Sequence, residues 1–174
     1  MMAAKVVFDR GKVGSAAFAL VALVACAVPP TSGPEESNSI QANGATAKMV
    51  RVEGAPLYNL EAVGEVVNPL SRGSVTLPLA GQFTATGWAL DQATQALAGG
   101  VDVAVDDRPY AAEYGADRID VAEHFGKPEL LKTGFKLSIP AAAIGKGRHD
   151  IRVRVVTPDG TQYREGSSLA LVIE

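Results

Sequence analysis

The stretch Ile151-Arg152-Val153-Arg154-Val155-Val156 alternates branched apolar residues with arginines over most of its length. Because successive side chains of a strand point to opposite faces, this period of two predicts a half-buried β-strand. Thr157-Pro158-Asp159-Gly160 follows and predicts a turn, since proline fixes φ and glycine supplies a positive φ. We therefore expect a return strand near Tyr163–Arg164 and a final strand over 169–173.

Short segments with the same character recur toward the N-terminus. Val101, Val103 and Val105 alternate with polar or small residues, and the run from Phe135 to Ile139 does the same and stops at Pro140. Further strand segments are expected at 49–52, 57–63, 75–77 and 82–90. Helix is expected only at 117–125, with a single turn at 141–144. Many short strands and one short helix predict an all-β fold, an antiparallel β-sandwich.

One of these strands departs from the period of two. In the segment 82–90, Phe83 and Ala85 share a face, whereas Trp88 and Leu90 fall on the other. Either both faces of this strand are covered, or a bulge at Gly87 returns Trp88 to the core. We favour the bulge, which places the Trp88 ring between the two sheets.

The N-terminal segment has the layout of a secretory signal. Lys5, Arg10 and Lys12 precede a mostly apolar run over 13–25. This run is shorter than the roughly 20 residues that a transmembrane helix needs, and Pro29 and Pro30 prevent its extension as a helix. A cleaved signal at 1–25 is therefore favoured over an uncleaved membrane anchor.

The run ends in Leu23-Val24-Ala25-Cys26, which resembles the lipobox of bacterial lipoproteins in all four positions. The resemblance implies cleavage before Cys26, a diacylglyceryl thioether on its sulfur and a further acyl chain on its amine. Membrane lipid is then the first partner, and the protein is anchored to a bacterial membrane, facing away from the cytoplasm. Ala27 is not the aspartate of inner-membrane retention, so the outer membrane is expected if the cell has two membranes. A plain secretory signal is the remaining alternative.

The residues after the signal divide into a spacer and a domain. Pro, Ser, Gly and Glu dominate after Cys26, and a segment of this kind buries too little apolar surface to fold. We expect a flexible tether over 26–47 and one domain over 48–174, an ordinary size for a single core.

Charge and cysteine content exclude some functions. The first 25 residues carry three basic side chains and one acidic side chain, so the remaining 149 residues have a net charge of −5, against −3 for the whole chain. An acidic surface argues against nucleic acid as a partner. Cys26 is the only cysteine, which excludes a disulfide or a thiolate metal site within the domain.

The domain resembles bacterial immunoglobulin-like (Ig-like) β-sandwich modules, which occur in envelope-associated proteins and appended to larger enzymes. The residues that carry the resemblance keep their order and spacing from Leu57 to the C-terminus; they are Gly87-Trp88-Ala89-Leu90-Asp91, 100–106, Tyr114-Gly115, 118–122, Gly134-Phe135 and Gly147-Arg148-His149. Asp107 and Ile119 depart from the pattern, at a turn and at a helix start. The resemblance implies an Ig-like architecture and no common activity.

The candidate metal site is a group of side chains on the expected helix. Asp120, Glu123 and His124 have i, i+3 and i+4 spacing and share one side. The spacing matches no specific metal motif, so a solvated helix face is the favoured interpretation and no metal is expected. Ile119, Ala122 and Phe125 are expected on the packed side.

No residue is assigned a catalytic role. His124 and His149 are the only histidines, and His149 is interpreted as a structural residue after a turn. The chain has no Gly-x-Ser-x-Gly, phosphate-loop or dinucleotide motif, so neither an enzyme nor a cofactor is expected.

Two functions therefore remain open. The domain is expected to act as a non-catalytic interaction or structural module that contacts an unknown envelope protein. The alternative is a glycan-binding module, for which Tyr110 and Tyr163 are the candidate exposed ring platforms. Such a module needs aromatic rings at the surface beside polar side chains.

Overall fold

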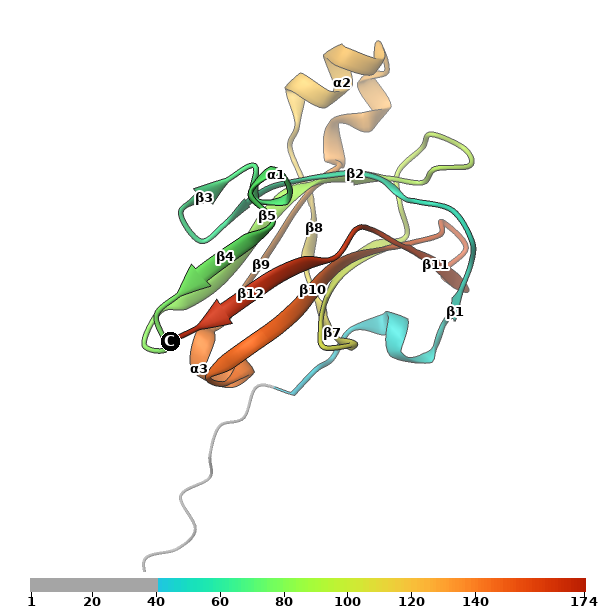
Figure 1. Ribbon diagram of the computed structural model, residues 1–174. Coiled ribbons are helices and arrows are strands. Elements are labelled where there is room, and N and C mark those ends of the chain that lie inside the picture. The colour runs from blue at the N-terminus through green and yellow to red at the C-terminus, as the bar shows by residue number, and fades with distance from the viewer. Residues whose placement is uncertain (1–40) are drawn as a thin grey trace, which may run out of the picture. The chain divides into compact units, whose positions relative to one another are not determined.

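The structure is a computed structural model and describes residues 41–174. The predicted lipobox at Leu23–Cys26, the predicted signal and the first part of the predicted tether lie outside the described residues. In the described part, two β-sheets face each other and short helices lie around them (Figure 1). None of the helices over 41–174 has the length and apolar character needed to cross a bilayer.

Seven strands form the first sheet, five form the second, and five short helical segments connect them. The first sheet contains β1 (Val50–Arg51), β4 (Ser74–Leu77), β6 (Gly100–Val105), β7 (Arg108–Ala111), β10 (Gly147–Val156), β11 (Gln162–Glu165) and β12 (Leu169–Ile173). The second contains β2 (Leu57–Val63), β3 (Val66–Val67), β5 (Gln82–Leu90), β8 (Glu113–Ala116) and β9 (Gly134–Pro140). The helical segments are η1 (Ala45–Lys48), α1 (Pro69–Arg72), α2 (Ile119–Phe125), η2 (Pro128–Lys132) and α3 (Ala141–Ile144).

β10 is the central strand of the first sheet. One of its edges pairs with β6 over Ile151–Val156, and its other edge pairs with β12 at one end and with β11 at the other. Ile151, Val153 and Val155 are buried toward the second sheet, as their alternation predicts. The pairings are antiparallel except for β1 with β11 and β12 with β4, at the margins of the sheet.

The core lies between the sheets and is built from their inward-facing apolar side chains. The first sheet contributes residues such as Val103, Ile151 and Leu171, and the second contributes Phe83, Phe135 and Leu137. This arrangement confirms the predicted all-β, Ig-like antiparallel sandwich, with α2 as the helix that was expected. β3, β7, β8 and the single turn α1 were not expected.

The predicted bulge in β5 is wrong. β5 pairs with β9 without interruption from Gln82 to Trp88, and the bulge lies instead in β2, between Leu60 and Ala62. Phe83, Ala85, Gly87 and Ala89 therefore face the core, whereas Trp88 and Leu90 face outward. Both faces of this end of β5 are covered, because α2 packs against Trp88 on the outer side.

The folded chain begins earlier than the predicted boundary at residue 48. The Thr46 N–H donates to the Asp102 carboxylate at 2.8 Å, and Asn43 accepts a hydrogen bond from the Ala111 N–H at 3.1 Å. Gly44 lies so close to Asp102 and Pro109 that a β-carbon would overlap them. Residues 43–48 thus cover Asp102 on the outer face of β6, a polar position that the sequence alone places in solvent.

The packed side of α2 also differs from the prediction. Val121 is buried and Phe125 is half-buried against Trp88, whereas Ile119 is 65% exposed. The helix begins after Arg118, and neither Asp117 nor Asp120 caps it through a side-chain hydrogen bond. The packed face therefore includes Val121 in place of the expected Ile119, whereas Ala122 and Phe125 are partly buried as expected.

The close approach at Gly87 yields a stability prediction. A β-carbon there would lie 2.0 Å from the Asn59 backbone oxygen and 3.0 Å from the Phe135 ring. Gly87→Ala should lower the free energy of unfolding by about 3 kcal/mol, as overpacking of a core does. The control is Gly100→Ala in β6, where the nearest atom would lie 4.0 Å away; it should change stability by less than about 0.5 kcal/mol. Urea unfolding measures both, and equal effects would contradict the packing described.

Candidate functional site

The two tyrosines predicted as exposed platforms are buried. Tyr110 is 3% exposed and belongs to the core between the sheets. Tyr163 is 8% exposed; it pairs with β1 and lies under the Arg154 guanidinium, whose central carbon is 5.0 Å from the ring centroid. Neither ring is an exposed platform, so the prediction that Tyr110 and Tyr163 are exposed stacking residues is wrong.

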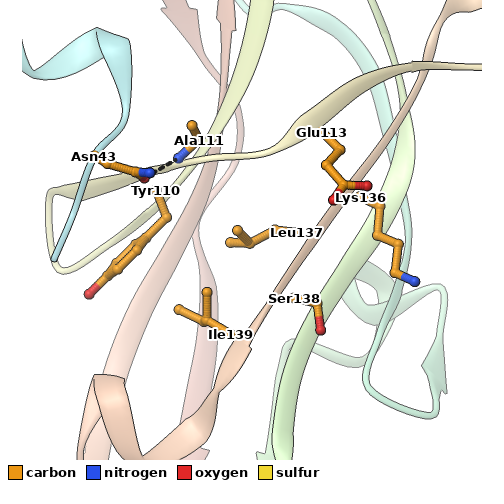
Figure 2. Close-up of a pocket in the computed structure, with 8 residues that line it drawn as sticks. All are labelled: Asn43, Tyr110, Ala111, Glu113, Lys136, Leu137, Ser138 and Ile139. Carbon is orange, nitrogen blue, oxygen red and sulfur yellow. Dashed lines mark hydrogen bonds between the residues drawn. The ribbon is translucent and has the colours of Figure 1, made fainter. Parts of the chain in front are cut away.

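A groove opens beside Tyr110 where the chain passes from one sheet to the other. β7 pairs with β6 in the first sheet, and after Ala112 the chain continues as β8 beside β9 in the second. The groove has a volume of about 360 Å³ and is lined by Asn43, Tyr110, Ala111, Glu113, Lys136, Leu137, Ser138 and Ile139 (Figure 2).

The backbone edge of β9 is open in this groove. The Ala141 N–H donates to the Gly81 carbonyl, so the alternation of an antiparallel ladder directs the N–H and C=O of Ser138 toward the groove. Lys136 and Pro140 flank this position, and both residue types discourage pairing with a further strand. The stretch of β9 with free backbone groups in this groove is therefore too short to pair with a further strand.

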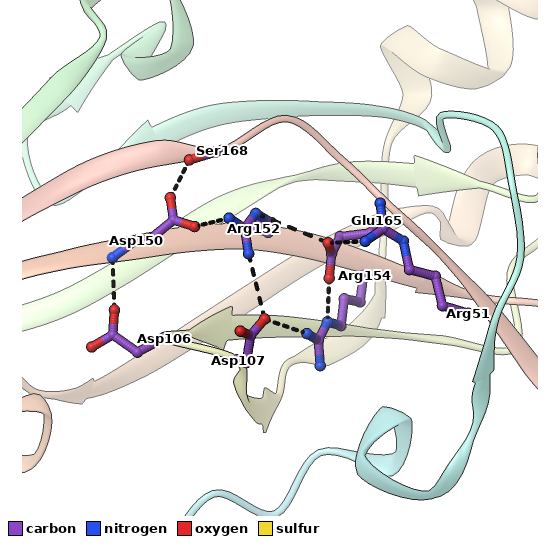
Figure 3. Close-up of polar contacts among 8 residues, drawn as sticks. All are labelled: Arg51, Asp106, Asp107, Asp150, Arg152, Arg154, Glu165 and Ser168. Atoms are coloured by element: carbon purple, nitrogen blue, oxygen red, sulfur yellow. Dashed lines mark hydrogen bonds and ion pairs between the residues drawn. The ribbon is translucent and has the colours of Figure 1, made fainter.

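An ionic cluster covers the outer face of the first sheet. Arg154 and Glu165 lie opposite each other on β10 and β11, with side chains only 7% and 4% exposed, and their ion pair measures 2.8 Å. Arg51 contacts Glu165 at 3.0 Å, and Arg154 contacts Asp107 at 3.1 Å. Arg152 joins the cluster through Asp150 and Asp107 (Figure 3). The charges are paired with one another, which indicates a structural role.

The turn between β6 and β7 is held by side-chain and backbone contacts from β10. Asp106 and Asp107 both have positive φ, which aspartate tolerates better than most residues. The Asp106 carboxylate accepts the Asp150 N–H at 2.9 Å and contacts His149 Nδ1 at 2.6 Å. Burial opposes ionisation of Asp106, but these hydrogen bonds outweigh it and lower the pKa. His149 also contacts the Gly145 carbonyl, which supports the predicted structural role.

Arg118, just before α2, binds two carboxylates at once. It donates to Glu61 at 2.9 and 2.7 Å and to Asp120 at 2.9 and 2.6 Å. Glu61 is the extra residue of the β2 bulge, and a bulge of this kind redirects a side chain. Hydrogen bonds to Asp120 and Glu61 raise the pKa of Arg118, and those from Arg118 lower the pKa of Asp120 to about 2.

Trp88 lines a cleft beside this ion cluster. The cleft has a volume of about 320 Å³ and is lined by Asn59, Glu61, Trp88, Asp120, Val121, His124 and Phe125. Trp88 is half-buried, and its ring meets Phe125 edge to face with centroids 6.0 Å apart. Asn59 lies directly opposite Trp88 on β2. This cleft brings an aromatic ring together with an amide, carboxylates and an imidazole, and sequence reasoning missed it.

The candidate metal residues do not converge. Asp120 is bound by Arg118, and His124 lies edge to face against Phe125. Over residues 41–174, no three His, Cys, Asp or Glu side chains are grouped to hold a metal ion.

An apolar groove of about 400 Å³ lies between α2 and η2. It is lined by Ile119, Ala122, Glu123, Gly126, Pro128 and Leu131. The exposed Ile119 adds a large apolar side chain to this surface.

Comparison with known proteins identifies no family. No family model matches the chain, and no curated protein matches it. Among solved structures, the chain is similar to the endo-β-1,4-mannanase from Thermotoga petrophila (TM-score 0.40, 11% identity), over 71% of this chain and 20% of the mannanase. It is also similar to domains 4 and 5 of the S-layer protein SbsC (TM-score 0.34, 14% identity), over 70% of this chain and 55% of that protein. The chain thus spans less than two thirds of either matched chain. The fold described above is that of a two-sheet β-sandwich domain.

The buried ion pair yields a second prediction. Glu165→Gln removes the negative charge that pairs with the buried Arg154 guanidinium. The free energy of unfolding should therefore fall by about 3 kcal/mol. The control is Asp117→Asn, which breaks an exposed pair with Lys132 and should cost less than about 1 kcal/mol. Urea unfolding at neutral pH compares the two. A Glu165→Gln effect no larger than that of the control would show that the cluster is solvated.

The lowered pKa of Asp120 yields an acid-stability prediction. The pKa of this carboxyl is about 2 in the folded protein and near 3.8 unfolded, so its stabilisation is complete above about pH 3.8 and is lost as the pH falls toward 2. Asp120→Asn should therefore show a shallower loss of stability between pH 4 and pH 2 than the unmodified protein. Glu123→Gln, on the same helix, is the control and should follow the unmodified protein. Parallel curves for all three chains would contradict the Arg118–Asp120 contact.

Proposed function

We propose that this chain is a lipid-anchored lipoprotein of a bacterial cell envelope that displays its β-sandwich as a non-catalytic interaction module. The observation that carries the proposal is Leu23-Val24-Ala25-Cys26 at the end of a basic and then apolar leader. The chain has no other cysteine, so an acylated sulfur would have no competing disulfide role.

The proposed anchor is sufficient on physical grounds. One acyl chain holds a protein only marginally, whereas two or more give stable attachment. A diacylglyceryl group on the Cys26 sulfur and a further chain on its amine exceed that threshold. Membrane lipid is then the first partner, and the outer membrane is the proposed location in a cell with two membranes.

The described chain enters the sandwich beside β7, and the length of the preceding segment limits the reach of a lipid anchor. η1 lies beside β7, at the end of the sandwich opposite α2 (Figure 1), and Asn43 accepts a hydrogen bond from Ala111 of β7. From Cys26 to Asn43 the chain reaches at most about 60 Å when fully extended. A domain anchored through Cys26 would therefore stay within about 60 Å of the lipid surface.

The distribution of charge supports a role in contact and not in turnover. Catalysis needs titratable groups that converge on a reacting atom. In the part of the chain that the structure describes, the buried ionic groups Arg154 and Glu165 pair with each other on a sheet face, and the buried Asp102 accepts the Thr46 N–H. Asp106 and His149 likewise secure a turn. We propose that the module binds an envelope component through its surface.

Substitution of the lipidated residue tests the proposal. Cys26→Ser removes the sulfur that would carry lipid, so labelled palmitate should no longer enter the protein and the protein should leave the membrane fraction. Ser37→Ala, in the tether, is the matched control and should keep both properties. Incorporation of palmitate and membrane association that persist unchanged in Cys26→Ser would refute the anchor.

A further inference from the structure

The Trp88 ring lies on the outer face of β5 and is not part of the core between the two sheets. The inward positions of β5 are filled by Phe83, Ala85, Gly87 and Ala89, so the core is complete without Trp88. On the outer face, Trp88 packs against Phe125 and is partly exposed in a cleft whose other lining residues include Asn59, Glu61, Asp120 and His124. A large ring beside convergent polar groups is typical of a small-molecule site.

The polar groups match the surface of a sugar. A pyranose ring has an apolar C–H face that stacks on an aromatic ring, and hydroxyls at its edge that both donate and accept hydrogen bonds. Asn59 is exposed opposite Trp88, and its side-chain amide offers two donors and an acceptor. Asp120 offers acceptors, and His124 supplies a donor and an acceptor when neutral.

The cleft is also held in shape before any ligand arrives. The Arg118 guanidinium binds Glu61 with one pair of hydrogen bonds and Asp120 with another. Two carboxylates from separate elements, β2 and α2, are thereby fixed at the rim. Fixed groups lose less conformational entropy on binding than mobile ones, which favours affinity.

The balance of charge restricts the class of sugar. Glu61 and Asp120 carry two negative charges, and Arg118 carries one positive charge that both carboxylates already share. The net negative charge would repel the carboxylate of a uronic acid, whereas a neutral sugar or an amino sugar meets no such repulsion. The volume of about 320 Å³ lies at the lower end of ligand pockets and suits one ring of a longer chain.

We propose that the cleft beside Trp88 binds a pyranose ring of a neutral or amino-sugar glycan, with Trp88 as the stacking platform and Asn59 and Asp120 as hydrogen-bonding partners of its hydroxyls. This site replaces the one at Tyr110 and Tyr163. It goes beyond the proposed anchor and does not depend on acylation of Cys26.

Trp88 is the only tryptophan in the chain, so its fluorescence reports on this cleft alone. The full-length protein, purified in detergent, is titrated with a cello-oligosaccharide, with an N-acetylglucosamine oligomer and with an oligogalacturonate of the same length. A saturable change in emission is expected with at least one of the first two. The acidic oligomer should give a change at least about tenfold weaker.

Three variants locate the site. Asn59→Ala alters an exposed side chain and should weaken binding by about fivefold to tenfold. Trp88→Ala, followed by calorimetry and checked for folding by circular dichroism, should lose at least about tenfold. Gln82→Ala is the control, because Gln82 is exposed on the same face of β5 and lies far from the cleft. Its binding should be unchanged.

Three outcomes would overturn the proposal. The first is no saturable change with either neutral or amino-sugar oligomer at millimolar concentration. The second is binding that survives unchanged in Asn59→Ala, which remains informative if Trp88→Ala does not fold. The third is a preference for the oligogalacturonate. A Cys26→Ser chain should bind as the unmodified chain does, so failure of the anchor and failure of the glycan site give different results.

Discussion

The alternation of side chains on β5 is the constraint from which the rest of this domain follows. Its inward residues after Phe83 are small, namely Ala85, Gly87 and Ala89, and Gly87 makes room for the Phe135 ring of the neighbouring strand. Its outward residues at the other end, Trp88 and Leu90, are large and apolar. Because a strand has only two faces, these outward residues need a second cover. For Trp88 this cover is α2, in the segment between β8 and β9, and the cleft forms at the edge of that cover.

Most of the strands could be predicted because their signal is local. β2, β5 and β12 have the expected bounds, and β10 and β9 extend the expected segments by a few residues. β7 and β8 could not be predicted in the same way, because Arg108–Ala116 has no alternation and changes sheet at Ala112. Polar residues that look solvent-exposed, such as Asp102 and Arg154, are buried by partners distant in sequence.

The candidate site could be predicted only in part. Leu60 and Val63 are both buried on one strand at a spacing of three, which a period of two does not allow. That spacing is a signal for the bulge in β2, and it argues against one at Gly87. The contact between Arg118 and Glu61 spans 57 residues and leaves no trace in the local sequence. The lipobox prediction at Leu23–Cys26, in contrast, rests on a local pattern alone and stays a prediction.

Trp88 is the residue on which the described arrangement of the domain can be tested most directly. The measurement is quenching of its fluorescence by acrylamide in the folded protein. The account predicts an emission maximum between those of buried and free tryptophan, with quenching that is clearly measurable. A blue-shifted emission that acrylamide does not reach would place the ring between the sheets and contradict the arrangement of β5, α2 and the cleft.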